Sequence, residues 1–400
     1  MKGCEKIMKF YENNPDFGQI YDWKKIFKEF NKLVPKGEYY NPTNMNFSKA
    51  RINMLLSERS VGKTTNILIL GMIANKHYNI RMHYIRNKQS EVRASIVSDL
   101  FNTINKFGYV SKITENRWSE VRYFQMERKW YYVNTDENGE VTERNSECLM
   151  YAMSIEKSSD YKSGYSCNNA DFIIVDEFIV IDDFKNRFQA LQDILSTLIR
   201  FRQSPVILYL SNTVDKQHYL FDEYAISETV WSLAKGDREY ITSELGSTIY
   251  VEYINEERIN QKKKNVNRLY FGFKNEKLNA ITGNDWYGKE YPHFFSEKTD
   301  VVLADNIYIE YYQRLQRLSI IKRENGVLLV YAHKATRTYD DSIIYTTNIT
   351  EDSRCRYLYG NGSKLDKLLT TLYDHKAFRY GTNSDGLLVE KFYNEYKNNK

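Results

Sequence analysis

The stretch RINMLLSERSVGKTTNILILGMIAN, residues 51–75, decides the fold class of this chain. It opens with a short apolar run at 52–56, continues through a loop of small and polar residues, and closes with an apolar segment of helical spacing at 65–75. A strand, a loop and a helix in this order form the setting that a phosphate-binding loop requires. We therefore expect a β-strand and an α-helix joined by an anion-binding turn.

The loop at residues 57–64 carries the chemistry of a nucleotide site. Backbone N–H groups at the start of a helix favour a phosphate, which the helix dipole also attracts. Lys63 is expected to bridge the β- and γ-phosphates of ATP, and the Thr64 hydroxyl to bind Mg²⁺. The usual signature opens with glycine, whereas Ser57 stands here, so the match is to Gly-Lys-Thr in context. The alternative is an ordinary surface loop that leads into a helix.

A second apolar run, residues 172–175, ends in Asp176-Glu177. An aspartate at the end of such a strand can serve the Mg²⁺ shell, and a glutamate directly after it can orient and deprotonate an attacking water. Small-molecule kinases do not need this glutamate, because their nucleophile is the substrate. The pair therefore predicts ATP hydrolysis, and the alternative is that the two acids only cap a strand.

Two further segments complete the predicted site. Asn212 follows the apolar run at 206–210, and a strand exit there places it beside the γ-phosphate. Arg59 could reach that phosphate in cis, while Arg200 or Arg202 could enter a neighbouring subunit's site. We prefer Arg200, and surface solvation is the alternative for each arginine. The expected nucleotide contacts are Ser57, Glu58, Arg59, Ser60, Val61, Gly62, Lys63, Thr64, Thr65, Asp176 and Asn212.

Strand-like and helical runs alternate along the N-terminal half, which predicts an α/β fold with a parallel sheet and crossover helices. Strands are expected at 52–56, 83–85, 172–175 and 206–210, meandering strands at 121–153 with a hairpin turn at Asn138-Gly139, and helices at 65–75, 91–107 and 187–202.

The predicted organisation has four parts. Residues 1–45 are a helical lead-in that packs on the next domain, and 46–231 form the ATPase domain. Residues 232–265 are assigned to a linker or hinge, because a hydrophilic stretch starts at 256. Residues 266–400 form a second, sheet-containing domain, with strand-like runs at 301–303, 307–312, 327–331 and 343–345.

Composition sets limits on the class of protein. The 400 residues are 42% hydrophobic and 27% charged, as in a globular protein, and the net charge of +5 is compatible with nucleic acid. The 4 cysteines show no paired spacing, which argues against a zinc module or a disulfide framework. The N-terminus lacks the apolar core of a signal peptide, and the longest apolar runs are far shorter than the ~20 residues that span a bilayer. We expect a cytosolic protein.

The ordered set of motifs resembles the DNA-packaging (encapsidation) ATPases of small picovirus-type tailed phages, which are related to terminase large subunits. The residues that carry the resemblance are Arg59, Gly62-Lys63-Thr64, Ile173-Ile174-Val175-Asp176-Glu177-Phe178, Ile199-Arg200-Phe201-Arg202 and Leu210-Ser211-Asn212-Thr213. The match covers roughly residues 50–215. It implies a P-loop ring ATPase of the additional-strand, catalytic-glutamate type, joined by a linker to an α+β ribonuclease-H-like domain.

The resemblance also implies a function and partners. A homopentameric ring on the portal (connector) of the prohead would drive double-stranded DNA inward, with a packaging RNA as a further possible partner. The protein would act in the host cytoplasm and transiently at the portal vertex, and would be missing from the mature virion. Residue roles carry over as Lys63 and Thr64 for phosphate and Mg²⁺, Asp176 for the metal, Glu177 as base, and Arg200 as trans finger, with Asn212 in a coupling motif.

Other readings stay open. The chain could be another nucleic-acid-stimulated ring ATPase such as a helicase, or a P-loop scaffold in which nucleotide only stabilises the fold. The second domain offers Asp300, Asp305, Asp340 and Asp341, but their spacing identifies no set of metal ligands for a nuclease. We expect it to be inactive as a nuclease.

Overall fold

The computed structural model divides the chain into two compact units, Met1–Tyr287 and Gly288–Lys400. The residues that it describes are 18–35, 37, 39–57, 61–162, 170–179, 186–212, 218–243, 245–255, 291–311, 314–347, 350–358 and 362–398. Across these ranges, no helix is both long and apolar enough to cross a membrane.

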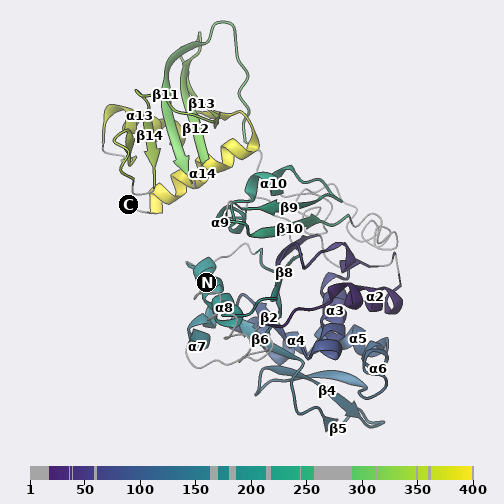
Figure 1. Ribbon diagram of the computed structural model, residues 1–400. Helices are drawn as coiled ribbons and strands as arrows, with labels where there is room; N and C mark the ends of the chain where they lie inside the picture. Colours follow the sequence, from purple (N-terminus) through teal and green to yellow (C-terminus); the bar gives the residue numbers. More distant parts are fainter. Residues whose placement is uncertain are drawn as a thin grey trace, which may run out of the picture. The chain divides into compact units, whose positions relative to one another are not determined.

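The first unit is built on one large sheet whose strands run in the order β3-β4-β6-β2-β7-β8-β1-β10-β9, with β5 paired to β4. Figure 1 labels several of its strands, from β4 and β5 to β9 and β10. The pairs from β6 to β10 are parallel, and the strands at both edges are antiparallel. The strands are β1 (Ile52–Leu56), β2 (Met82–Arg86), β3 (Glu120–Phe124), β4 (Lys129–Thr135), β5 (Val141–Arg144), β6 (Met150–Ser154), β7 (Phe172–Asp176), β8 (Val206–Ser211), β9 (Arg238–Thr242) and β10 (Thr248–Tyr253). The parallel sheet that the sequence predicts therefore forms the central part of a larger sheet, whose edge strands are antiparallel.

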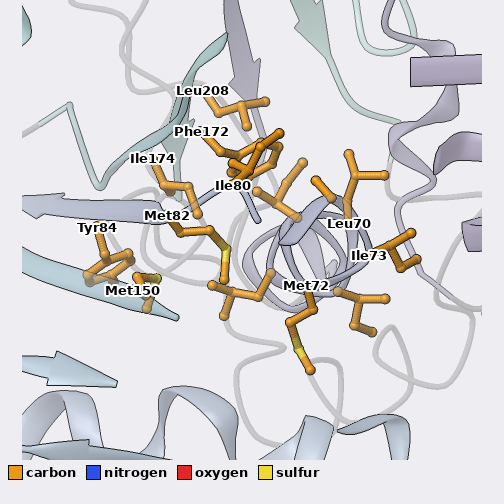
Figure 2. Close-up of a cluster of buried hydrophobic side chains, with 14 of the residues drawn as sticks. Leu70, Met72, Ile73, Ile80, Met82, Tyr84, Met150, Phe172, Ile174 and Leu208 are labelled. Carbon is orange, nitrogen blue, oxygen red and sulfur yellow. The ribbon is translucent and has the colours of Figure 1, made fainter. Parts of the chain in front are cut away.

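Helix α3 (Lys63–Tyr78) is apolar on all sides and is therefore buried on all sides. One side packs on the sheet, and others contact α2 (Trp23–Leu33), α5 (Asn102–Lys106) and α6 (Tyr109–Ile113). Figure 2 shows this layer, in which side chains of α3 such as Leu70 meet Phe172 and Leu208 from the strands. A Cβ at Gly71 would overlap Met82, so glycine permits the close approach of helix and sheet.

The opposite face of the sheet is covered by α8 (Arg187–Ile199), whose buried residues Leu191, Ile194 and Leu198 follow the helical period. The central strands are buried on both faces, which explains their largely apolar sequences. The lead-in helix α2 places Trp23, Ile26 and Phe30 in the same core as α3. Each such buried side chain contributes ~1.5–3 kcal/mol relative to an exposed one.

The segment 91–107, predicted as one helix, is a chain of short ones: η3 (Gln89–Val92), α4 (Ala94–Val97), η4 (Ser98–Phe101) and α5. Arg93 is extended between the first two. Ser98 Oγ donates to the Ala94 carbonyl, and the amide of Asn102 donates to Asp99. Such local side-chain bonds compete with helix propagation. The remaining short helices are η2 (Pro42–Asn44), η5 (Ile155–Lys157), α7 (Ser158–Lys162), α9 (Leu220–Glu223) and α10 (Ser227–Ser232).

The predicted linker at 232–265 was placed too early. Strands β9 and β10 lie inside this range, and β10 pairs in parallel with β1, the strand that leads into the predicted phosphate loop. Glu252 is buried in β10 and accepts hydrogen bonds of 2.8 Å from the hydroxyls of Tyr40 and Tyr250. The hydrophilic stretch that begins at 256 lies outside the described residues.

The second unit has its own sheet in the order β15-β14-β11-β12-β13-β16 and its own core, with α13 and α14 contributing buried side chains. Its elements are β11 (Val301–Tyr311), β12 (Arg314–Lys322), β13 (Leu328–Ala335), β14 (Ile343–Thr346), β15 (Cys355–Arg356), α13 (Lys364–Asp374), β16 (Phe378–Tyr380) and α14 (Asn383–Asn398). The runs predicted separately at 301–303 and 307–312 form one strand, β11, with two register shifts between them.

Candidate nucleotide-binding site

The predicted site residues follow parallel neighbouring strands, whose carboxyl ends meet at one edge of the sheet. Strand β8 lies between β1 and β7. The predicted phosphate loop follows β1, Asp176 ends β7, and Asn212 comes directly after β8. Three segments that are far apart in the sequence therefore contribute to one site.

Lys63 is the centre of this site. Its side chain is buried, and its ammonium group donates to Ser57 Oγ and, over 3.1 Å, to Asn212 Oδ1. The amide of Asn212 in turn donates to Glu177 Oε1 over 3.4 Å. The structure thus links four of the predicted residues by direct hydrogen bonds.

The end of the phosphate loop has a backbone shape that glycine permits. Gly62 precedes α3 with φ +77°, and α3 then begins at Lys63 with Thr64 and Thr65 half-buried in its first turn. The N–H of Tyr40 donates to the carbonyl of Val61 over 2.9 Å, which ties the loop to the preceding segment. Glu58, Arg59 and Ser60 lie outside the described residues, so the cis role of Arg59 stays a prediction.

Replacing Gly62 with alanine should destabilise the protein by more than the same change at Gly108. Both glycines have positive φ, a conformation that costs other residues about 1–2 kcal/mol. A Cβ at Gly62 would also lie 2.8 Å from Cδ1 of Tyr39, whereas nothing lies within 4 Å of one at Gly108. Urea unfolding of the two variants measures the difference, and Tyr39→Ala added to Gly62→Ala should recover only the steric part. Equal losses at the two glycines would contradict this packing.

Asp176 is buried at the end of β7 and accepts a 2.7 Å hydrogen bond from the hydroxyl of Tyr84. Burial raises the pKa of this carboxyl, because it disfavours the charged form, and the nearby guanidinium of Arg86 and ammonium of Lys63 oppose that rise. A divalent cation, like Arg86 and Lys63, would favour the charged carboxylate of Asp176 and so oppose the rise of its pKa.

The donor set fits Mg²⁺. The described residues hold no cluster of three or more acidic, histidine or cysteine side chains that could bind a metal alone. Mg²⁺ at nucleotide sites is held by one or two carboxylates together with substrate phosphates and water. The carboxylate of Asp176 and the hydroxyl of Thr64 are oxygen donors of the kind that it prefers.

Arg86, at the end of β2, is a site residue that the sequence analysis missed. Its guanidinium lies 2.5 Å from Glu177 Oε2 and 3.6 Å from Asp176 Oδ2. The amide of Asn87 holds the backbone carbonyl of Glu177 at 2.9 Å, and Glu177 itself has φ 52°. The strand predicted at 83–85 ends just before Arg86. This position at a strand end was the feature of the sequence that could have identified Arg86 as a site residue. Both carboxylate oxygens of Glu177 are therefore engaged, one by Arg86 and one by Asn212.

The two candidate finger arginines differ sharply in environment. Arg202 is buried, and its guanidinium lies 2.7 Å from Asp171 Oδ2, which also accepts a 2.6 Å hydrogen bond from Tyr21. Arg200 is exposed where α8 ends, with φ 39°, and Phe201 beside it is 62% exposed. Because the side chain of Arg202 is buried and paired with Asp171, Arg200 remains the candidate for contact with another subunit.

Solved structures with a similar fold are phage DNA-packaging motors. The Phi-28 gp11 DNA packaging motor aligns with a TM-score of 0.56 and 17% identity, covering 90% of this chain and 98% of that one. A chain of the bacteriophage Phi-29 viral genome packaging motor assembly aligns with a TM-score of 0.58 and 16% identity, covering 90% and 99%. No protein-family model and no curated protein matches the sequence. The resemblance drawn from the motifs is confirmed at the level of fold: this chain has the architecture of these phage DNA-packaging motor proteins over nine-tenths of its length.

Proposed function

We propose that the chain hydrolyses ATP and uses the energy to move double-stranded viral DNA through the portal of a preformed prohead. The observation that carries the proposal is the connected set of contacts from Lys63 through Asn212 and Glu177 to Arg86. A cation for phosphates, a sensing amide and a general base are joined there without a break. A loop that served only to cap a helix would not need this arrangement.

The residues divide the work as follows. The N–H groups at the start of α3 and the ammonium of Lys63 bind the phosphates of ATP. Asp176 and Thr64 would hold Mg²⁺, which neutralises phosphate charge as the terminal bond breaks. Glu177 takes a proton from the attacking water. A γ-phosphate would compete with Asn212 for Lys63, and Asn212 would thereby report its presence to Glu177.

Coupling to DNA is supported by the shared architecture with packaging motors. Contact with the phosphate backbone suits a motor, because phosphates recur along every duplex while base edges differ. We further propose a homopentameric ring, attached to the portal in the host cytoplasm and missing from the mature virion, with a packaging RNA as a possible third component. Arg200 would act across the subunit boundary.

The second unit is proposed to be a ribonuclease-H-like domain without nuclease activity. The antiparallel order β11-β12-β13, followed by β14 in parallel beside β11, supports the fold assignment. Two of the acids considered for catalysis have local partners, since Asp305 pairs with Arg317 at 2.6 Å and Asp341 accepts from Asn306. Mn²⁺-dependent cleavage of plasmid DNA by the purified chain would overturn the inactive assignment.

The decisive experiment measures ATP hydrolysis with and without double-stranded DNA. We expect DNA to stimulate turnover, and Lys63→Ala to lower it by about 10²-fold or more, because one preorganised charge at a transition state contributes that much. Stimulation by forked substrates, with strand separation, would instead indicate a helicase. Equal, negligible turnover in both proteins would leave only a nucleotide-stabilised scaffold.

A further inference from the structure

Tyr40 joins three parts of the first unit that are far apart in the sequence. Its backbone N–H donates to the carbonyl of Val61 over 2.9 Å, at the end of the predicted phosphate loop. Its carbonyl accepts a 2.6 Å hydrogen bond from the side-chain amide of Asn66 in α3. Its hydroxyl donates over 2.8 Å to Oε2 of Glu252 in β10, 212 positions further along the chain. One residue therefore links the loop, the helix that follows it and a distant strand.

The contacts of Tyr40 lie in the protein interior, because Tyr40, Asn66 and Glu252 are all buried. A hydrogen bond there is electrostatically stronger than one in water, and breaking it leaves a buried polar group unpaired. Burial raises the pKa of Glu252, while the hydroxyls of Tyr40 and Tyr250 oppose this rise by stabilising the charged form. Glu252 is therefore a fixed acceptor that holds the Tyr40 hydroxyl in place.

The end of the phosphate loop takes its shape against this same segment. Gly62 has φ +77°, and a Cβ there would lie 2.8 Å from Cδ1 of Tyr39. A phosphate loop binds through backbone N–H groups that must point at the anion. A loop that is already held in the binding shape loses less conformational freedom when its ligand arrives, and this increases affinity. Tyr40 has the position needed to hold the loop in that way.

We propose that Tyr40 is a positioning residue of the nucleotide site, and that through it the nucleotide affinity of the loop depends on Glu252. The described hydrogen bonds of Glu252 go to the hydroxyls of Tyr40 and Tyr250 and to the side chain of Asn44. Glu252 therefore reaches the loop through Tyr40. A buried carboxylate in the sheet would then control how tightly the loop holds a phosphate. The inference rests on the proposed ATP site.

Tyr250 provides a matched control for Tyr40. Its hydroxyl donates to the same oxygen, Oε2 of Glu252, over the same distance of 2.8 Å. Its backbone pairs with Asn53 of β1 and Tyr240 of β9, in the sheet rather than at the loop. Tyr40→Phe and Tyr250→Phe thus remove equivalent bonds from one acceptor, and they differ in whether that bond leads to the loop.

The test measures the affinity of the full chain for fluorescent ADP and ATP analogues with Mg²⁺, together with the urea midpoint of each variant. Tyr40→Phe should weaken both nucleotides by about three- to tenfold, the effect of one hydrogen bond, because the loop holds phosphates that ADP and ATP share. Tyr250→Phe should leave both affinities unchanged. The two variants should lower the urea midpoint similarly, so lost stability alone cannot explain the difference in affinity.

A double-mutant cycle tests whether Tyr40 acts through Glu252. Glu252→Gln makes the acceptor neutral and its hydrogen bonds weaker, so this variant should itself weaken both nucleotides. Tyr40→Phe should then cost less affinity in the Glu252→Gln background than in wild type. Equal affinities of Tyr40→Phe and Tyr250→Phe, or an equal effect of Tyr40→Phe in both backgrounds, would overturn the inference and leave the ATP site in place. No nucleotide binding by the wild type would overturn both.

Discussion

Glu177→Gln should lower the rate of ATP hydrolysis by about 10²–10⁴-fold, the contribution of a positioned general base, and should leave ATP binding nearly intact. The one amide oxygen of glutamine can still accept from Arg86, while its NH₂ group takes the place of the oxygen that accepts from Asn212, so one of the two contacts is kept while the proton acceptor is lost. Single-turnover hydrolysis and equilibrium binding of a fluorescent ATP analogue measure the two effects separately.

A matched variant tests the role of the neighbouring cation. Glu177→Ala removes both the base and one acidic partner of Arg86, in a pair whose side chains are 13% and 36% exposed. Arg86 keeps Glu91 and Asp176 nearby, so the loss of this partly exposed pair should be modest. Glu177→Ala should therefore lower the rate and also the urea midpoint, and Glu177→Gln, which keeps an acceptor for Arg86, should lower the midpoint less. Wild-type turnover in Glu177→Gln would assign the base to another residue.

The sequence was a good guide wherever local pattern and chain order were enough. Residues 52–56 and 172–175 are central strands because largely apolar runs need two covered faces. The convergence of Lys63, Asp176 and Asn212 followed from the rule that carboxyl ends of parallel strands share an edge. These inferences required no knowledge of which strand neighbours which.

The errors came from contacts between distant segments. Arg86 acts in the site because β2 lies beside β7, an adjacency that no local spacing encodes. Strand β10 lies in the range assigned to the linker, and its place in the sheet depends on pairing with β1, about two hundred residues earlier in the chain. The prediction of one helix at 91–107 was wrong for a local reason. The side chains of Ser98 and Asn102 form hydrogen bonds within the segment, and these compete with a continuous helix despite the regular apolar spacing.

The two arginines at the end of α8 should give opposite phenotypes, although they are two residues apart. Arg202→Ala removes the guanidinium that pairs with the buried carboxylate of Asp171, and the loss of one partner in a buried pair costs about 3–5 kcal/mol. Arg200→Ala removes an exposed side chain, so stability should change by less than about 1 kcal/mol. As a trans finger, however, Arg200 should contribute about 10³–10⁵ to the rate. Urea unfolding and DNA-stimulated ATPase assays measure the two effects.

Mixing variants decides whether Arg200 acts between subunits. A Lys63→Ala subunit cannot hydrolyse ATP but still presents Arg200, and an Arg200→Ala subunit keeps its own Lys63 and Glu177. If the arginine acts in trans, the mixture should regain turnover that neither protein has alone, because intact sites then receive a neighbour's arginine. A mixture as inactive as its components would place Arg200 in its own subunit's site or outside catalysis. Arg202→Ala offers no such rescue, since its defect lies in the fold of each chain.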